Sequence, residues 1–159
     1  LGKPIYEILA AARLRMLLEA LEMQVRTEMT EPAPVPAKLQ VEHILPQAWK
    51  THWALPPDVD PEEARQRRNV MLHTLGNLTL LTERLNPSVS NGPWSDKKAA
   101  ILEHTILRLN LNLGGFREWN EAAIQLRAQS LFEAATRIWP FPPGPGRGDA
   151  QPELGNQNA

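Results

Sequence analysis

Apolar residues recur every three or four positions in the first part of the chain. Between Pro4 and Met29 the aliphatic side chains with this spacing are Ile5, Leu9, Leu14, Leu18, Leu21 and Val25. The polar positions between them carry oppositely charged pairs four residues apart, such as Arg15 and Glu19. This pattern is typical of an amphipathic helix. We therefore predict one continuous helix, followed by a linker that is rich in proline at positions 32, 34 and 36.

Two shorter apolar runs have the length of strands. Residues 39–45 alternate in polarity and stop at Pro46, and residues 78–81 follow Gly76 and Asn77. Short runs of this kind, bounded by turn residues, are typical of strands. Gly76, just before the second run, predicts a backbone turn that a side chain would forbid. An ordinary turn at the entry to the strand explains this glycine equally well.

The remaining patterns predict helices. Asp60 followed by Pro61 favours a short helix over 62–68, and Thr82 favours a helical turn over 83–86. Ser95 is a favourable cap for a helix that runs to about Leu113. Its expected buried positions are Leu102, Ile106, Leu109 and Leu113.

Two further predictions concern the end of the chain. A last helix is expected over 120–138, before the Trp139-Pro140 pair. From Phe141 onward the chain is rich in Pro, Gly, Asn and Gln, so we predict a disordered tail over 141–159. Together these elements predict a mostly helical α+β fold.

Composition limits the chemistry. The chain has 159 residues, of which 42% are hydrophobic and 22% charged, the balance of one globular domain. No apolar run approaches the roughly 18 residues that a membrane span requires, and no leader is visible, so we expect a soluble, cytoplasmic protein. The absence of cysteine excludes disulfides and thiolate zinc sites. A bound metal would need His, Asp, Glu or Asn ligands, which favours a hard cation such as Mg²⁺.

Charge alone does not predict nucleic acid as a partner, because the net charge is −1. Between Arg65 and Lys98, however, six basic residues stand against two acidic ones. This excess is compatible with a DNA-contacting face and equally with an ordinary solvated surface.

The residues best suited to catalysis are Glu42 and His43. Phosphodiester hydrolysis needs an activated water and a cation that stabilises negative charge, and a neutral imidazole beside a divalent ion supplies both. A Glu-His pair alone is more often a surface feature or part of a core. Neighbours on a strand also point to opposite faces, so the two side chains can approach one phosphate only if the chain bends, as Pro46 would favour.

The pattern becomes more specific when it is extended along the chain. Residues 42–46, followed by residues 76–81 and then Asn86, nine positions after Asn77, resemble the signature of HNH (ββα-metal, His-Me finger) nucleases. The nearer resemblance is to the C-terminal nuclease domain of GmrSD-type modification-dependent restriction enzymes and of the phosphorothioate-sensing Ssp defence nuclease. Three stretches carry it: residues 42–47; residues 75–81 with Asn86, Ser90, Asn91 and Lys97; and Trp119, Asn120, Ile124, Arg127, Trp139 and Pro140.

This resemblance implies a function for each residue of the site. His43 is the general base, Glu42 and Asn86 bind one Mg²⁺ or Mn²⁺ ion, and Asn77 braces the loop that carries the base. Lys97 is expected to reach the scissile phosphate, with Lys98 as its rival. With a single carboxylate, the site should bind the metal weakly.

Further side chains are candidates for contact with DNA, although a solvated helix face would look the same. They are Arg65, Arg68, His73, Arg84, Asn91, Lys98 and Arg127. The five tryptophans are scattered along the chain, so we expect them to anchor the core rather than to stack on bases.

The predicted organisation is an N-terminal helix (1–30) that packs on an HNH nuclease domain (31–140), before the tail. The ββα-metal motif would lie among flanking helices. The resemblance implies a metal-dependent DNA endonuclease of low sequence specificity, the nuclease module of a bacterial anti-phage restriction protein. The sensor and nucleotide-hydrolysing portion would precede this chain, and a homo-oligomer is left open. The alternatives are a non-catalytic DNA-binding or regulatory module with the same fold, and an RNase.

Overall fold

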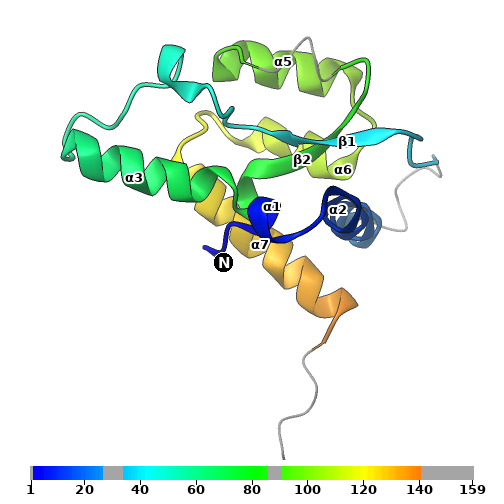
Figure 1. The fold of residues 1–159 in the computed structure, drawn as a ribbon. Coiled ribbons are helices and arrows are strands. Elements are labelled where there is room, and N and C mark those ends of the chain that lie inside the picture. Colours follow the sequence, from blue (N-terminus) through cyan, green and yellow to red (C-terminus); the bar gives the residue numbers. More distant parts are fainter. Residues whose placement is uncertain (1, 27–33, 86–90, 141–159) are drawn as a thin grey trace, which may run out of the picture.

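The computed structural model describes residues 2–26, 34–85 and 91–140. Within these ranges a two-stranded antiparallel sheet lies among helices (Figure 1). This arrangement confirms the mostly helical α+β class. The elements are α1 (Ile5–Ile8), α2 (Ala11–Val25), β1 (Leu39–His43), α3 (Pro61–Leu72), β2 (Leu78–Thr82), α5 (Trp94–His104), α6 (Arg108–Leu111) and α7 (Glu121–Ile138), with short 3₁₀ turns η1 (Trp49–Thr51), η2 (Leu75–Asn77) and η3 (Asn112–Gly115).

The register of the sheet places its two faces in different surroundings. Leu39 lies opposite Thr82 and His43 opposite Leu78, although a long connection separates the strands in sequence. One face, with Leu78 and Leu80, packs on leucines of α2 and on the second half of α7. The other face, with Leu81, packs on α5 and on the loop after β1. The sheet therefore lies between α5 on one side and α2 with α7 on the other (Figure 1).

The predicted first helix is broken in two. Leu9 and Ala10 are extended, with ψ angles of 138° and 143°, and they separate α1 from α2. The segment contains no proline or glycine that would signal a break. The tertiary contacts account for it: the Tyr6 N–H donates to the carbonyl of His73 at 3.1 Å, while α2 packs on the sheet. Docking of α1 beside the end of α3 thus overrides the local preference for helix.

The predicted helix from Ser95 to Leu113 is also two helices. Residues 105–107 are not helical, and the carboxylate of Glu22 accepts the N–H groups of Arg108 and Leu109 at 3.0 and 2.9 Å. This buried carboxylate caps a new helix, α6. Ile106 is 51% exposed, so the expected buried stripe is wrong there, whereas Leu109 and Leu113 are fully buried. Ser95 is not the cap of α5, which begins after Pro93 without a side-chain cap.

Two helix starts agree with the prediction. The Asp60 carboxylate accepts the N–H groups of Glu62 and Glu63 at 3.0 Å each, and Pro61 is the first residue of α3. The Asn120 side chain accepts the N–H of Ala123 at 3.1 Å at the start of α7. The predicted turn over 83–86 is present at residues 83–85, where the Leu85 N–H donates to the carbonyl of Thr82 at 3.1 Å. Asn86 and the predicted tail lie outside the described residues.

Three of the five tryptophans lie in the core, as expected: Trp49, Trp53 and Trp119. Trp94 is partly buried against them. Trp139, at the end of α7, is 48% exposed, so the expectation of a core anchor is wrong for it. Among the described helices, none has both the length and the apolar character needed to cross a bilayer.

Candidate functional site

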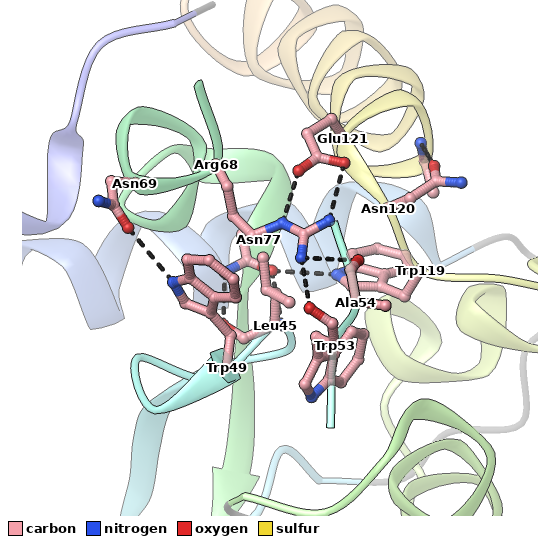
Figure 2. A network of polar contacts seen from close by, with 11 residues as sticks. Leu45, Trp49, Trp53, Ala54, Arg68, Asn69, Asn77, Trp119, Asn120 and Glu121 are labelled. Carbon is pink, nitrogen blue, oxygen red and sulfur yellow. Dashed lines mark hydrogen bonds and ion pairs between the residues drawn. The ribbon is translucent and has the colours of Figure 1, made fainter. Parts of the chain in front are cut away.

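The loop that follows β1 is pinned by one buried amide side chain. Asn77 Oδ1 accepts the N–H of Leu45 at 2.7 Å, and Asn77 Nδ2 donates to the carbonyl of Leu45 at 2.9 Å (Figure 2). Asn77 Nδ2 also donates to the carbonyl of Leu72 at 2.9 Å. The Asn77 carbonyl also accepts the N–H of Ile44 at 2.8 Å. The residues directly after His43 are therefore held to the start of β2 and to the end of α3.

Asn77 and its neighbours are held in turn by two side chains, Trp119 just before α7 and Arg127 on α7. The indole N–H of Trp119 donates to Asn77 Oδ1 at 3.0 Å, so that both oxygen lone pairs and both amide hydrogens are used. Arg127 Nη1 donates to the carbonyls of Gly76 and Leu78, on either side of Asn77, at 2.8 Å each. Burial lowers the pKa of Arg127 to about 9, so its guanidinium remains charged near neutral pH. Arg127 thus fixes the backbone around Asn77 and is too deeply buried for the predicted contact with DNA.

Gly76 lies where two elements approach closely. A Cβ atom at this position would stand 2.1 Å from the carbonyl oxygen of Ile124 and 2.9 Å from the Cβ of Ala128. Its φ angle is not positive, so the predicted reason, a turn conformation that only glycine adopts, is wrong. The physical reason is steric: η2 packs directly on the backbone of α7.

Glu42 is paired with a buried lysine from α5. Lys97 Nζ donates to Glu42 Oε1 at 3.0 Å and to the carbonyl of His43 at 2.6 Å, and its side chain is inaccessible to solvent. Burial lowers the pKa of Lys97, although the negative charge of Glu42 and the hydrogen bond to it act in the opposite direction. Lys97 was expected to reach the phosphate. In the structure it instead binds the end of β1, through the His43 carbonyl, and orients the Glu42 carboxylate, which is 15% exposed.

His43 is a buried, neutral imidazole at the end of β1. Its Nε2 lies 3.2 Å from Nδ1 of His73, and the ring of Tyr6 packs edge-on against it with 4.4 Å between the centroids. Burial, followed by electrostatic interactions with His73 and Lys97, lowers the pKa of His43 to about 4. The ring is therefore unprotonated at neutral pH, which a general base requires.

Glu42 and His43 occupy opposite faces of the strand pair. Glu42 lies across from Thr79 and His43 across from Leu78, and residues that face each other across a ladder share one side of the sheet. The chain bends directly after β1, at Ile44 and Leu45. The two residues are linked through Lys97, which donates to the Glu42 carboxylate and to the His43 carbonyl.

Arg68 is the centre of a second polar network (Figure 2). Its guanidinium donates to both carboxylate oxygens of Glu121, at 2.6 and 3.3 Å, and to the carbonyls of Trp53 and Ala54, at 2.6 and 3.0 Å. It also stacks over the ring of Trp49, 4.9 Å from the centroid. Burial raises the pKa of Glu121, but the hydrogen bonds and positive charge of Arg68 outweigh this effect and lower it. Arg68 therefore joins α3, α7 and the loop after β1, and the predicted contact of Arg68 with DNA is wrong.

The other candidates for DNA contact lie nearer the surface. Arg65, Arg84 and Asn91 are exposed, and Arg65 forms an ion pair with Glu62 at 2.8 Å. Lys98 is half-buried and donates to the carbonyl of Phe116 at 3.0 Å. In the part of the chain that the structure describes, which omits Asn86, no three His, Asp or Glu side chains are grouped so that they could hold a metal ion.

Two residues near His43 were not expected from the sequence. Tyr6 and Glu7 belong to α1, and Glu7 Oε1 lies 3.5 Å from Nε2 of His73. No pattern in the sequence signals these contacts, because they arise from the docking of α1 beside a segment more than sixty positions away.

Comparison with known proteins identifies the family. A search of curated proteins and a search of solved structures each returned no match. A family model described as "GmrSD restriction endonucleases, C-terminal domain" matches residues 1–134 of the 159. This match includes every described element up to the greater part of α7. The chain therefore belongs to the family of C-terminal domains of GmrSD restriction endonucleases.

Proposed function

We propose that this domain is an HNH-type endonuclease that hydrolyses DNA phosphodiester bonds with the help of one divalent cation. Its family is a module of restriction endonucleases, which implies a nuclease-related activity, DNA as the substrate and an N-terminal partner portion. The observation that carries the catalytic part is the neutral imidazole of His43, at the end of β1 and directly before the loop that Asn77 fixes.

In this mechanism His43 is the general base. The neutral ring accepts a proton from a water molecule, the water oxygen attacks phosphorus, and the bond to the leaving sugar oxygen breaks, with a proton from solvent neutralising that oxygen. Asn77 accepts the N–H of Ile44 with its carbonyl and the N–H of Leu45 with its side chain, and its amide donates to the Leu45 carbonyl. Because Ile44 directly follows His43, these bonds hold the base in position. A fixed base lowers the entropic part of the barrier.

The residues proposed to hold the cation are Glu42 and Asn86. Glu42 offers a hard carboxylate oxygen, and Lys97 binds one of its two oxygens at 3.0 Å. A single carboxylate with an amide suits Mg²⁺, which keeps several waters and often completes its shell with phosphate oxygens. A bound cation would supply charge stabilisation to the developing phosphorane.

We further propose that cleavage has little sequence preference. The exposed basic side chains include Arg65 and Arg67 on α3 and Arg84 after β2, and most contacts of such residues with DNA are to phosphates, which carry no sequence information. Arg, Gln and Asn do cluster at positions 65–69 of α3, but Arg68 is bound to Glu121 and Asn69 to the indole of Trp49, so these two side chains are not available to base edges. Discrimination between kinds of DNA would then belong to the N-terminal portion.

The test is a cleavage assay on supercoiled plasmid. We expect nicking with Mg²⁺ or Mn²⁺, none with chelator, and a large loss in His43→Ala and Asn86→Ala. The matched control is His104→Ala, which changes an exposed histidine at the end of α5. Nicking by His43→Ala at the rate of wild type would contradict the mechanism. Preferential cleavage of an RNA substrate would favour the alternative that the domain is an RNase.

A second candidate function has one observation in its favour. Lys97 already neutralises the Glu42 carboxylate at 3.0 Å, an arrangement that a DNA-binding module without a metal could also use. The same assay separates the two functions. Retarded migration of DNA in a gel, with no cutting under any divalent cation, would support the binding module.

A further inference from the structure

A chain of polar contacts leads from His43 to the N-terminal segment. His43 Nε2 lies 3.2 Å from His73 Nδ1, and His73 Nε2 lies 3.5 Å from Glu7 Oε1. The three side chains come from β1, the end of α3 and α1, respectively. None of the functions proposed above for His43, Glu42 or Asn86 uses His73 or Glu7.

When His73 is neutral, its contact with Glu7 determines where the hydrogens lie. A carboxylate can only accept, so the ring nitrogen of His73 that faces Glu7, Nε2, carries the hydrogen. A neutral His73 then has its lone pair on Nδ1, and Nδ1 accepts from His43 Nε2. His43 Nε2 is therefore protonated, and the lone pair of His43 is left on Nδ1. Of the two neutral forms, this is the one that presents Nδ1 as the basic atom.

We propose that His73 is a positioning residue for His43: it fixes the ring orientation and the Nε2–H tautomer of the base, and Glu7 fixes the tautomer of His73. This inference rests on the proposed function of His43 and extends it to a specific atom, Nδ1, as the proton acceptor. It also gives α1 a part in the site, because α1 supplies Glu7.

The surroundings restrain the pair of histidines. The ring of Tyr6 packs edge-on against His43 and is stacked near His73, with centroid distances of 4.4 and 5.7 Å. The N–H of Tyr6 donates to the carbonyl of His73 at 3.1 Å, which joins α1 to the histidine that it flanks. The His73 side chain is 20% exposed and Glu7 is 59% exposed, so Glu7 lies at the solvent end of the chain of contacts. We accordingly expect Glu7 to contribute less than His73.

The first measurement needs no nuclease activity. Long-range ¹H–¹⁵N spectra of the full chain distinguish a protonated ring nitrogen from an unprotonated one, and His43→Gln identifies the His43 signals. We expect Nε2 of His43 to be protonated and Nδ1 unprotonated in wild type, and both tautomers to be populated in His73→Ala. A wild-type spectrum with the hydrogen on His43 Nδ1 would overturn the proposal.

The second measurement is the rate of plasmid nicking. For His73→Ala we expect kcat to fall about ten- to a hundredfold with KM nearly unchanged, as for other groups that orient a reacting side chain. His73→Gln should recover part of the rate, because its amide oxygen can accept from His43 Nε2. Glu7→Gln should lose less kcat than His73→Ala, and since Glu7 is exposed this variant will fold. The matched control is His104→Gln, in which both the His43 tautomer and kcat should match wild type.

Each result has a distinct meaning. A kcat of His73→Ala equal to that of wild type would contradict the positioning role, and an unchanged kcat in Glu7→Gln would contradict the part assigned to Glu7. If wild type fails to cut DNA under any divalent cation, the proposed function fails, while the ¹⁵N spectra still decide whether His73 fixes the tautomer of His43.

Discussion

The side chain of Asn77 joins three segments that are far apart in sequence: the loop after β1, the end of α3 and the start of α7. It is fully buried, so every hydrogen bond that it makes would have to be replaced if it were changed. Buried donors and acceptors left without partners each cost about 1–3 kcal/mol. This makes Asn77 the residue at which the stability of the fold and the geometry of His43 are most closely linked.

We predict that Asn77→Asp destabilises the protein strongly. The carboxylate has nearly the shape of the amide, but it cannot donate to the carbonyls of Leu45 and Leu72, and it would be buried beside them. The expected loss in the free energy of unfolding is about 3 kcal/mol or more. Denaturant titration measures it. The control is Asn112→Asp, at an exposed position, and equal stabilities of the two variants would contradict the role of Asn77.

His43 gives a second prediction at this scale. Its pKa is about 4 in the folded protein and 6.5 when unperturbed, so between these values the unfolded chain binds a proton that the folded protein does not. Stability should therefore fall as the pH drops from 6.5 to 4, by about 2 kcal/mol at pH 5. Denaturant titrations at pH 7 and pH 5 test this. His43→Gln, which lacks the titrating group, should show a smaller pH dependence, and an unchanged one would contradict the assignment.

The sequence indicated some of these residues and concealed the burial of others. His43, Glu42 and Asn77 belong to a motif with fixed spacing, so their importance could be inferred from the resemblance. Arg68 and Arg127 were expected to contact DNA, and Lys97 was expected to reach the scissile phosphate, but all three are buried. Basic residues are usually exposed, so nothing in the sequence signals this burial. Their partners are Glu121, Glu42 and backbone carbonyls, which come from other elements, so only the folded chain reveals that these charges point inward.

At the scale of elements, the helix starts that depend on local residues were predicted, and the helix breaks were not. Asp60 and Asn120 cap helices with their own side chains, within three residues of the N–H groups that they accept. The break between α5 and α6 depends on Glu22, which lies 86 positions before Arg108. A periodic apolar pattern cannot signal a cap that another helix provides.

The contact between η2 and α7 gives a prediction for an element boundary. In Gly76→Ala the new methyl group would stand 2.1 Å from the carbonyl oxygen of Ile124, so η2 and α7 must separate. Overpacking of this kind costs about 1–3 kcal/mol or more. Because Asn77 adjoins Gly76, we also expect slower nicking of plasmid. Both the midpoint of thermal unfolding and the nicking rate should fall.

A matched control is available for this substitution. In Gly114→Ala the new methyl group would lie 3.6 Å from a methyl of Leu102, an ordinary contact. This variant should unfold and nick like wild type, or be slightly more stable, since alanine reduces the freedom of the unfolded chain. If Gly76→Ala behaved like Gly114→Ala, the close approach of η2 and α7 would not be required.

At the scale of the whole molecule, the mostly helical α+β class could be predicted from the apolar patterns, whereas the arrangement of the helices around the sheet could not. The patterns predicted two strands and several helices, and the strands do pair. In the structure α5 covers one face of the sheet, and α2 and α7 cover the other. This arrangement depends on which of the two hydrophobic cores each leucine faces, and both cores are assembled from segments throughout the chain. The ion pair between Arg68 and Glu121 joins parts of this arrangement that no local pattern relates.

This ion pair provides the last prediction. In Arg68→Met the Glu121 carboxylate loses its partner in a buried setting, and the carbonyls of Trp53 and Ala54 lose their donor. Breaking a buried pair in this way typically costs about 3–5 kcal/mol, and replacing both partners by apolar residues costs less. We therefore expect Arg68→Met to be much less stable than wild type and Arg68→Met/Glu121→Leu to recover part of the loss. The control is Arg67→Met, at the exposed neighbouring position, which should leave stability unchanged. If Arg68 instead contacted DNA, Arg68→Met would weaken DNA binding without changing stability, and the double variant would recover nothing.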